Sequence, residues 1–203
     1  MENSDKSLDT AAKRVYDVAP SEMFGAFMKT GWAPTPLEGI TQDEVIAYCV
    51  KRRADLSAAL SGLRVVLPSG GPKQSSNDTD YQYRPHTAFA YYTGVQGVEA
   101  HPDSVLVMEP SGEAHTPIMF INPRLTRDTD AFYRDAKNGE LWVGRRLTTD
   151  EAAQRYGIEV RPLTSLAVRR TRPGYATSPC TTIFYRELDE RVKSHLQNQL
   201  PRL

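Results

Sequence analysis

Apolar and amphipathic segments alternate along the chain, and this order predicts a mixture of strands and helices. Short apolar runs at 64–67, 105–108 and 118–121 predict strands, and strand character returns at 158–160 and 180–184. Uninterrupted apolar runs are typical of strands that are covered on both faces of a sheet. We therefore expect an α/β fold, a layered mixed β-sheet flanked by helices on both faces.

Turn chemistry and aromatic content refine the strand assignment. The runs at 105–108 and 118–121 flank Glu109-Pro110-Ser111-Gly112, where Pro110 favours a turn and Gly112 relaxes it, so a hairpin is predicted. Aromatic residues are dense between 81 and 93 and have high strand propensity, so a half-buried strand ending at Thr93-Gly94 is predicted there.

Two capping boxes predict helix starts, since in each a threonine hydroxyl and a glutamate three residues later can satisfy free backbone amides. They are Thr41-Gln42-Asp43-Glu44 and Thr148-Thr149-Asp150-Glu151, and Gly157 is expected to end the second helix. Other segments with helical character are 126–136, which is either a helix or an ordered insertion, 162–168 and 188–197.

Residues 1–40 are predicted to form an N-terminal arm, and residues 41–203 the main domain. In the arm Phe24, Phe27, Met28 and Trp32 fall at helical spacing, between Pro20 and two later prolines. The arm either covers part of the core or contacts another subunit or domain. The pattern does not separate these two interpretations.

Charge and cysteine content exclude several classes of function. The 25 basic and 25 acidic residues balance, so nucleic acid is not an expected partner. The short basic clusters 51–53 and 169–172 are interpreted as solvated faces or interdomain contacts. The N-terminus is polar and no apolar run is long enough for a secretory signal or a membrane span, which predicts a cytoplasmic protein.

No catalytic or metal-binding pattern is visible. The four histidines (His86, His101, His115 and His195) are neither paired at i and i+4 on a helix nor placed near cysteine at zinc-ligand spacing. Cys49 and Cys180 are far apart and are expected to be buried thiols. No cofactor or metal site is therefore expected in this chain.

Several strings in the middle of the chain resemble the N-terminal domain of aminopeptidase P, in the creatinase/prolidase group. The resemblance spans about residues 45–160 and also includes Gly31-Trp32-Ala33-Pro34 in the arm. The matching strings, in the order of that family, are Asn77–Arg84, Phe89–Gly94, Val105–Pro110, Glu140–Arg146 and Tyr156–Ile158.

The resemblance implies a ribonuclease-H-like domain that precedes a C-terminal pita-bread catalytic domain. In that family the catalytic domain binds two divalent metal ions, often manganese, and hydrolyses the bond before proline by two-metal chemistry. None of the catalytic domain's strings occurs before Leu203. The resemblance thus implies an inactive fragment that gates peptides with proline at the second position, supports homo-oligomers and partners a catalytic domain.

The resemblance also carries three substrate-access residues: Trp142, Asp78 and Arg84. Trp142 lies in the string whose tryptophan reaches toward a neighbouring subunit's active site in related enzymes, and an indole can stack on a proline ring. The alternative for Trp142 is a buried core aromatic. Asp78 and Arg84 either flank the peptide path or form a structural ion pair.

Two other hypotheses remain. One is a standalone protein-interaction module without a catalytic partner. The other is the N-terminal domain of a prolidase or of a creatinase-like amidinohydrolase.

Overall fold

The computed structural model describes residues 21–77, 79–166 and 182–184. Its main sheet has five strands in the order β6-β5-β4-β1-β7. The strands are β1 (Arg64–Pro68), β4 (Val105–Ser111), β5 (Ala114–Ile121), β6 (Glu159–Pro162) and β7 (Thr182–Phe184). β4 pairs antiparallel with β1 and β5, whereas β6 and β7 add parallel to β5 and β1. The expected mixed sheet is confirmed.

The central strands are buried on both faces, as their apolar runs predict. In β4, Leu106 and Met108 belong to the larger core cluster, and Val107 between them belongs to a smaller cluster on the opposite face. All three are at most 2% exposed. Because successive side chains of a strand point to opposite faces, only a sheet covered on both sides can bury such a run.

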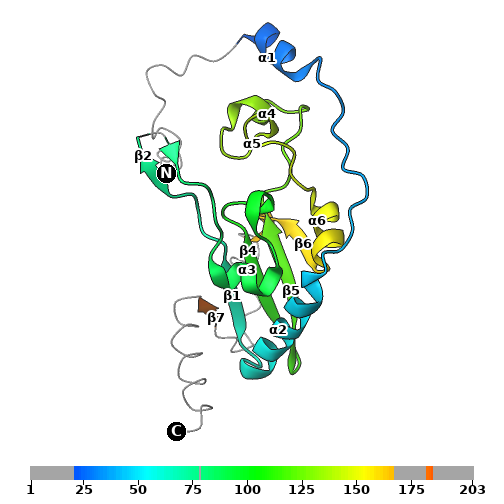
Figure 1. Ribbon diagram of the computed structural model, residues 1–203, viewed down its shortest axis with the longest axis vertical. Helices are drawn as coiled ribbons and strands as arrows, with labels where there is room; N and C mark the ends of the chain where they lie inside the picture. Colours follow the sequence, from blue (N-terminus) through cyan, green and yellow to red (C-terminus); the bar gives the residue numbers. More distant parts are fainter. Residues whose placement is uncertain (1–20, 78, 167–181, 185–203) are drawn as a thin grey trace, which may run out of the picture.

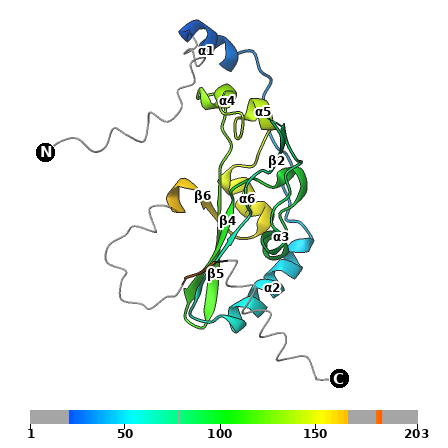
Figure 2. The ribbon, with the colours of Figure 1, turned by 90° about the vertical axis from the view of Figure 1, so that its left-hand side faces the viewer.

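Three helices cover one face of the sheet: α2 (Val45–Ala59), α3 (Thr87–Thr93) and α6 (Thr149–Tyr156). Figures 1 and 2 show them together on that side. The opposite face is covered by Leu163 and Leu166, at the start of a helical segment described over residues 164–166. The expectation of helices on both faces is thus met.

A second group of elements lies at one end of the sheet (Figure 1). It contains α1 (Glu22–Lys29), α4 (Ala131–Arg134), α5 (Glu140–Val143) and the hairpin of β2 (Gln74–Ser76) and β3 (Thr79–Asp80). A single 3₁₀ turn, Gly97–Glu99, follows α3. From α1 the chain runs in extended form along the edge of the molecule to α2.

The predicted strand at 81–93 is wrong, because its second half is helix α3. Phe89 and Thr93 are one helical turn apart and both are buried, and the Thr93 hydroxyl donates to the Phe89 carbonyl oxygen at 2.7 Å. Gly94 ends the helix with φ +78°, a conformation that favours glycine. Packing against α2 and the sheet thus outweighs the strand propensity of the aromatic side chains.

The two predicted capping boxes have different outcomes. At Thr148 both hydrogen bonds of the box are present, and Gly157 ends α6 in the left-handed conformation. At Thr41 the box does not form, since α2 begins only at Val45 and Glu44, its N-cap residue, makes no capping hydrogen bond through its side chain.

The predicted hairpin is confirmed, but its turn is displaced. Pro110 is paired with His115 inside the ladder, and the turn lies beyond it around Gly112, which has φ +63°. Cys49 is a buried free thiol, as expected. The segments 169–172 and 188–197, together with Cys180 and His195, lie outside the described residues.

In the part of the chain that the structure describes, no helix has both the length and the apolar character needed to cross a membrane.

Candidate functional site

The described part of the N-terminal arm, residues 21–40, packs on α4, at the end of the molecule away from the larger core. Ser21 caps α1 by accepting a hydrogen bond from the Phe24 amide at 3.3 Å. From this helix Lys29 pairs with Asp130 at 2.7 Å, and the Phe24 ring meets the Tyr133 ring edge to face, with centroids 6.1 Å apart. The arm therefore contacts its own chain.

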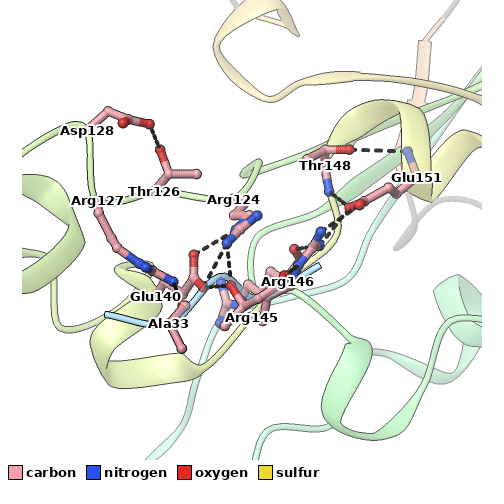
Figure 3. Close-up of polar contacts among 11 residues, drawn as sticks. Ala33, Arg124, Thr126, Arg127, Asp128, Glu140, Arg145, Arg146, Thr148 and Glu151 are labelled. Atoms are coloured by element: carbon pink, nitrogen blue, oxygen red, sulfur yellow. Dashed lines mark hydrogen bonds and ion pairs between the residues drawn. The ribbon is translucent and has the colours of Figure 1, made fainter. Parts of the chain in front are cut away.

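Arginine side chains fasten the extended part of the arm. Arg127 donates to the carbonyl oxygens of Trp32 and Ala33 at 3.0 and 2.6 Å. The Trp32 ring also meets the Phe132 ring edge to face, with centroids 5.6 Å apart. These contacts hold the arm against the segment that carries α4; Figure 3 shows Arg127 beside Ala33.

Thr35 of the arm joins a buried ion pair at the start of α5. Arg124 donates to both carboxylate oxygens of Glu140, at 2.7 and 2.9 Å (Figure 3). Thr35 donates its hydroxyl to the same carboxylate at 2.9 Å. Burial would raise the pKa of Glu140, but the hydrogen bonds from Arg124 and Thr35 outweigh it and hold the pKa below its usual value. Glu140 is therefore a charged anchor.

A second ion pair follows α5. Arg145 forms a two-pronged contact with Glu151 at 2.7 and 2.6 Å, and its Nε donates to the Thr35 carbonyl oxygen at 3.0 Å. The hydrogen bonds from Arg145, followed by those of the Thr148 cap, lower the pKa of Glu151 to about 2. The same carboxylate thus caps α6 and orients Arg145 (Figure 3).

Trp142 lies on α5 between these two anchors and is 60% exposed. Its indole Nε1 donates to the Tyr133 carbonyl oxygen at 2.7 Å, so the exposed ring is held by its polar edge. The buried-core alternative for Trp142 is wrong. Trp142 is therefore an exposed aromatic side chain whose polar edge is held in place.

The other two predicted site residues are Arg84 and Asp78. Arg84 is exposed in the loop between β3 and α3, and within the described ranges it has no ion-pair partner. Asp78 lies outside the described residues. Its neighbour Asn77 has φ +42° at the turn of the β2–β3 hairpin, a left-handed conformation that asparagine tolerates.

A groove of about 540 Å³ separates this hairpin from the connection between α4 and α5. It is lined by Pro72, Gln74, Asn77, Asp80, Ala136 and Lys137. The hairpin and the connection that leads to Trp142 are thus neighbours in space, although they are far apart in sequence.

Within residues 21–77, 79–166 and 182–184 no group of three or more metal-ligating side chains comes together. His115 uses both ring nitrogens, at 2.7 Å from the Ser57 hydroxyl and 2.6 Å from the Leu63 carbonyl oxygen. His101 is buried, which lowers its pKa to about 4, and its Nδ1 lies 3.1 Å from the Asn122 carbonyl oxygen. These residues do not fit a dimetal centre.

No pattern in the sequence indicates Thr35 and Arg124 as partners of Glu140. Thr35 and Glu140 are 105 positions apart. The only local hint is that Thr35 lies between two prolines, which restrict its backbone.

Comparisons with known proteins agree on one family. The family described as "Aminopeptidase P, N-terminal domain" matches residues 49–171. Xaa-Pro aminopeptidase 1 of Streptomyces coelicolor is 42% identical over 140 residues, which cover 69% of this chain and 28% of that protein. Xaa-Pro aminopeptidase 2 of the same organism is 36% identical over 154 residues, 75% of this chain and 32% of that protein.

A solved structure supports the fold. The structure of a putative aminopeptidase P from Bacillus anthracis matches with a TM-score of 0.55 at 17% identity, over 80% of this chain and 37% of that one. The chain therefore spans about a third of the length of the proteins it matches.

Proposed function

The chain belongs to the family of aminopeptidase P N-terminal domains, and we propose that it is the non-catalytic N-terminal domain of a bacterial Xaa-Pro aminopeptidase. In this role it gates the access of peptides with proline at the second position to an active site in a C-terminal catalytic domain. It also takes part in homo-oligomerisation.

The observation that carries this proposal is the exposed and fixed indole of Trp142. A tryptophan that is 60% exposed contributes little to the core, yet its ring is held at 2.7 Å by the Tyr133 carbonyl oxygen. An exposed aromatic side chain that has lost its freedom in advance binds a ligand ring at lower entropic cost. A groove of about 540 Å³ between the β2–β3 hairpin and the α4–α5 connection gives an extended peptide room on this end of the molecule.

Hydrolysis is assigned to the catalytic domain. Two divalent metal ions, which we propose to be manganese, would there supply an activated hydroxide. The described residues of this chain offer no ligand cluster for such ions. The proposed role of this chain is to orient the peptide through the Trp142 ring and to restrict the size of the peptides that reach the active site. Arg84 and Asp78 are further proposed contacts with the peptide.

Exposed apolar side chains on α1 support the oligomerisation part of the proposal. Met23 is 83% exposed and Phe27 is 72% exposed, and they lie one helical turn apart on the same face. Contiguous exposed apolar surface favours protein contacts. The cytoplasmic location stays a prediction.

The proposal is tested in a hybrid enzyme in which this chain replaces the 140 matched residues of Xaa-Pro aminopeptidase 1 of Streptomyces coelicolor. Trp142→Ala is expected to lower kcat/KM for a Xaa-Pro peptide by roughly tenfold, the equivalent of about 1.4 kcal/mol of lost stacking. Trp142→Phe should retain most of the activity, because a ring remains.

The matched control is Tyr48→Ala on α2, which removes an aromatic side chain of similar exposure, 66%, away from α5. It should leave kcat/KM unchanged. Gating by Trp142 is refuted if Trp142→Ala cleaves the peptide as fast as the parent hybrid, or if Tyr48→Ala slows cleavage equally.

A further inference from the structure

One residue of the arm, Thr35, contacts both ends of the segment that carries Trp142. Its hydroxyl donates to Glu140, the first residue of α5, at 2.9 Å. Its carbonyl oxygen accepts from Nε of Arg145, two residues beyond the end of α5, at 3.0 Å. The four-residue helix is therefore bracketed by hydrogen bonds to a single position.

Both partners of Thr35 are already fixed by ion pairs with low exposure. The side chains of Arg124 and Glu140 are 17% and 7% exposed, and those of Arg145 and Glu151 are 12% and 22% exposed. Ion pairs shielded from water resist screening and hold a defined geometry when all their hydrogen bonds are made. Thr35 adds hydrogen bonds to both ion pairs. Its hydroxyl oxygen accepts from Arg124 Nη2 at 2.7 Å as well as donating to Glu140, and its carbonyl oxygen accepts from Arg145.

Thr35 itself is held rigidly in the arm. Pro34 and Pro36 flank it, and a residue before proline is restricted to extended backbone. Arg127 fixes the carbonyl oxygens of the two residues that precede Pro34. Because the backbone of Thr35 is restrained, its hydrogen bonds to Glu140 and Arg145 also restrain the position of α5 relative to the arm.

We propose that Thr35 is a positioning residue for Trp142: the arm acts as a strap that fixes α5 and so sets the orientation of the exposed indole. The consequence for peptide access rests on the proposed function. The immobilisation of the indole is independent of the proposed function, because it is measured without peptide or metal. The competing explanation is that the network around Thr35 only stabilises the fold.

Tryptophan fluorescence separates these explanations, because the chain has two tryptophans, Trp32 and Trp142. In a Trp32→Phe background all tryptophan emission comes from Trp142. Thr35→Val then removes the hydroxyl while keeping the branched shape of the side chain. Thr35→Ser restores a hydroxyl at the same place, and Thr126→Val is the matched control, since the Thr126 hydroxyl bonds a carboxylate, Asp128, without contacting α5 (Figure 3).

We expect Thr35→Val to lower the steady-state anisotropy of Trp142 and to raise its acrylamide quenching constant. Exchange of the Trp142 and Gly144 backbone amides, whose hydrogen bonds form α5, should accelerate roughly tenfold, as the loss of a hydrogen bond to a charged group implies. Thr35→Ser should behave as the Trp32→Phe parent, and Thr126→Val should change none of these quantities.

The strap is refuted if Thr35→Val leaves anisotropy, quenching and amide exchange at the parent values. It is equally refuted if Thr126→Val changes them as much, since the effect would then be a general loosening. If Thr35→Val does not fold, the same measurements on Thr35→Ser and Arg145→Lys test the proposal. Arg145→Lys keeps the charge and loses the two-pronged contact with Glu151. Unchanged exchange of the Gly144 amide in Arg145→Lys contradicts the proposal.

A second measurement in the hybrid enzyme separates this inference from the proposed function. If Thr35 acts on peptides through Trp142, Thr35→Val should raise KM in the parent hybrid and have no further effect in the Trp142→Ala hybrid. If Trp142→Ala alone has no effect on cleavage, the proposed function fails, and the fluorescence result still decides whether the strap exists. An equal effect of Thr35→Val in both backgrounds shows that Thr35 does not act through Trp142.

Discussion

Acid is expected to weaken the protein through Glu151, the carboxylate shared by Arg145 and the cap of α6. Arg145 contacts its two carboxylate oxygens at 2.6 and 2.7 Å, and the Thr148 amide donates to it at 2.8 Å. All three bonds favour the charged form, which is why the pKa of Glu151 falls to about 2. Protonation removes the charge that Arg145 requires.

The magnitude follows from the difference between the folded and unfolded pKa of Glu151. A fall from 4.5 to about 2 corresponds to about 3 kcal/mol, at about 1.4 kcal/mol per pH unit. Because the side chain is 22% exposed and water screens part of the interaction, we take about 2–3 kcal/mol. The folded pKa is the lower one, so this stability is present above pH 4.5 and is lost as the pH falls from 4.5 towards 2.

The assay is urea unfolding of the parent chain, Glu151→Gln and Asp150→Asn between pH 7 and pH 3. Asp150 is the matched control, since it is an exposed carboxylate in the same first turn of α6. Glu151→Gln should cost about 2–3 kcal/mol at pH 7, and its difference from the parent should shrink by more than half between pH 5 and pH 3. Asp150→Asn should cost less than about 1 kcal/mol.

A difference between parent and Glu151→Gln that stays constant from pH 7 to pH 3 refutes this reasoning. The same holds if Asp150→Asn reproduces both the size and the pH dependence of the effect, because helix dipole and net charge would then account for it. Either result removes the assignment of a strong Arg145–Glu151 pair.

Three further variants test the fold by the change in the free energy of urea unfolding at pH 7. Phe89→Ala should cost about 3–5 kcal/mol, because the ring is 1% exposed in the larger core, and a cost below about 1 kcal/mol would contradict its place there. Gly94→Ala should cost more than about 1 kcal/mol, since φ is +78° and the new Cβ would lie 2.9 Å from Val45; a neutral change would contradict the left-handed end of α3. Thr148→Ala should cost about 1 kcal/mol for the lost cap of α6, and no cost would mean that the capping box contributes nothing.

Local patterns predicted the parts of the fold that local contacts determine. The capping box at Thr148 forms because the first turn of α6 follows it directly, and the hairpin forms because its two strands are adjacent in the chain. The same pattern fails at Thr41, since α2 begins only at Val45. The aromatic segment before Gly94 has high strand propensity, which predicts a strand. The prediction fails because propensity carries no information about whether a helix or a strand buries Phe89 better.

The candidate site depends on contacts between distant parts of the chain. The exposure of Trp142 was one of two interpretations open to the sequence, and the structure decides between them. The strap was not foreseen, because Thr35 and Arg145 are 110 positions apart and each belongs to a segment without regular periodicity. Hydrogen bonds between segments so distant in sequence can be identified only from the folded structure, in which the arm lies beside α5.

The most direct test of the central proposal, in which this chain shapes peptide access and the catalytic domain performs the hydrolysis, is an activity assay on the isolated 203-residue chain. The purified chain is incubated with manganese and a Xaa-Pro peptide, and release of the first residue is followed beside the hybrid enzyme as the positive control. We predict cleavage by the hybrid and none by the chain above the buffer rate. Manganese-dependent release by the chain alone would contradict the account.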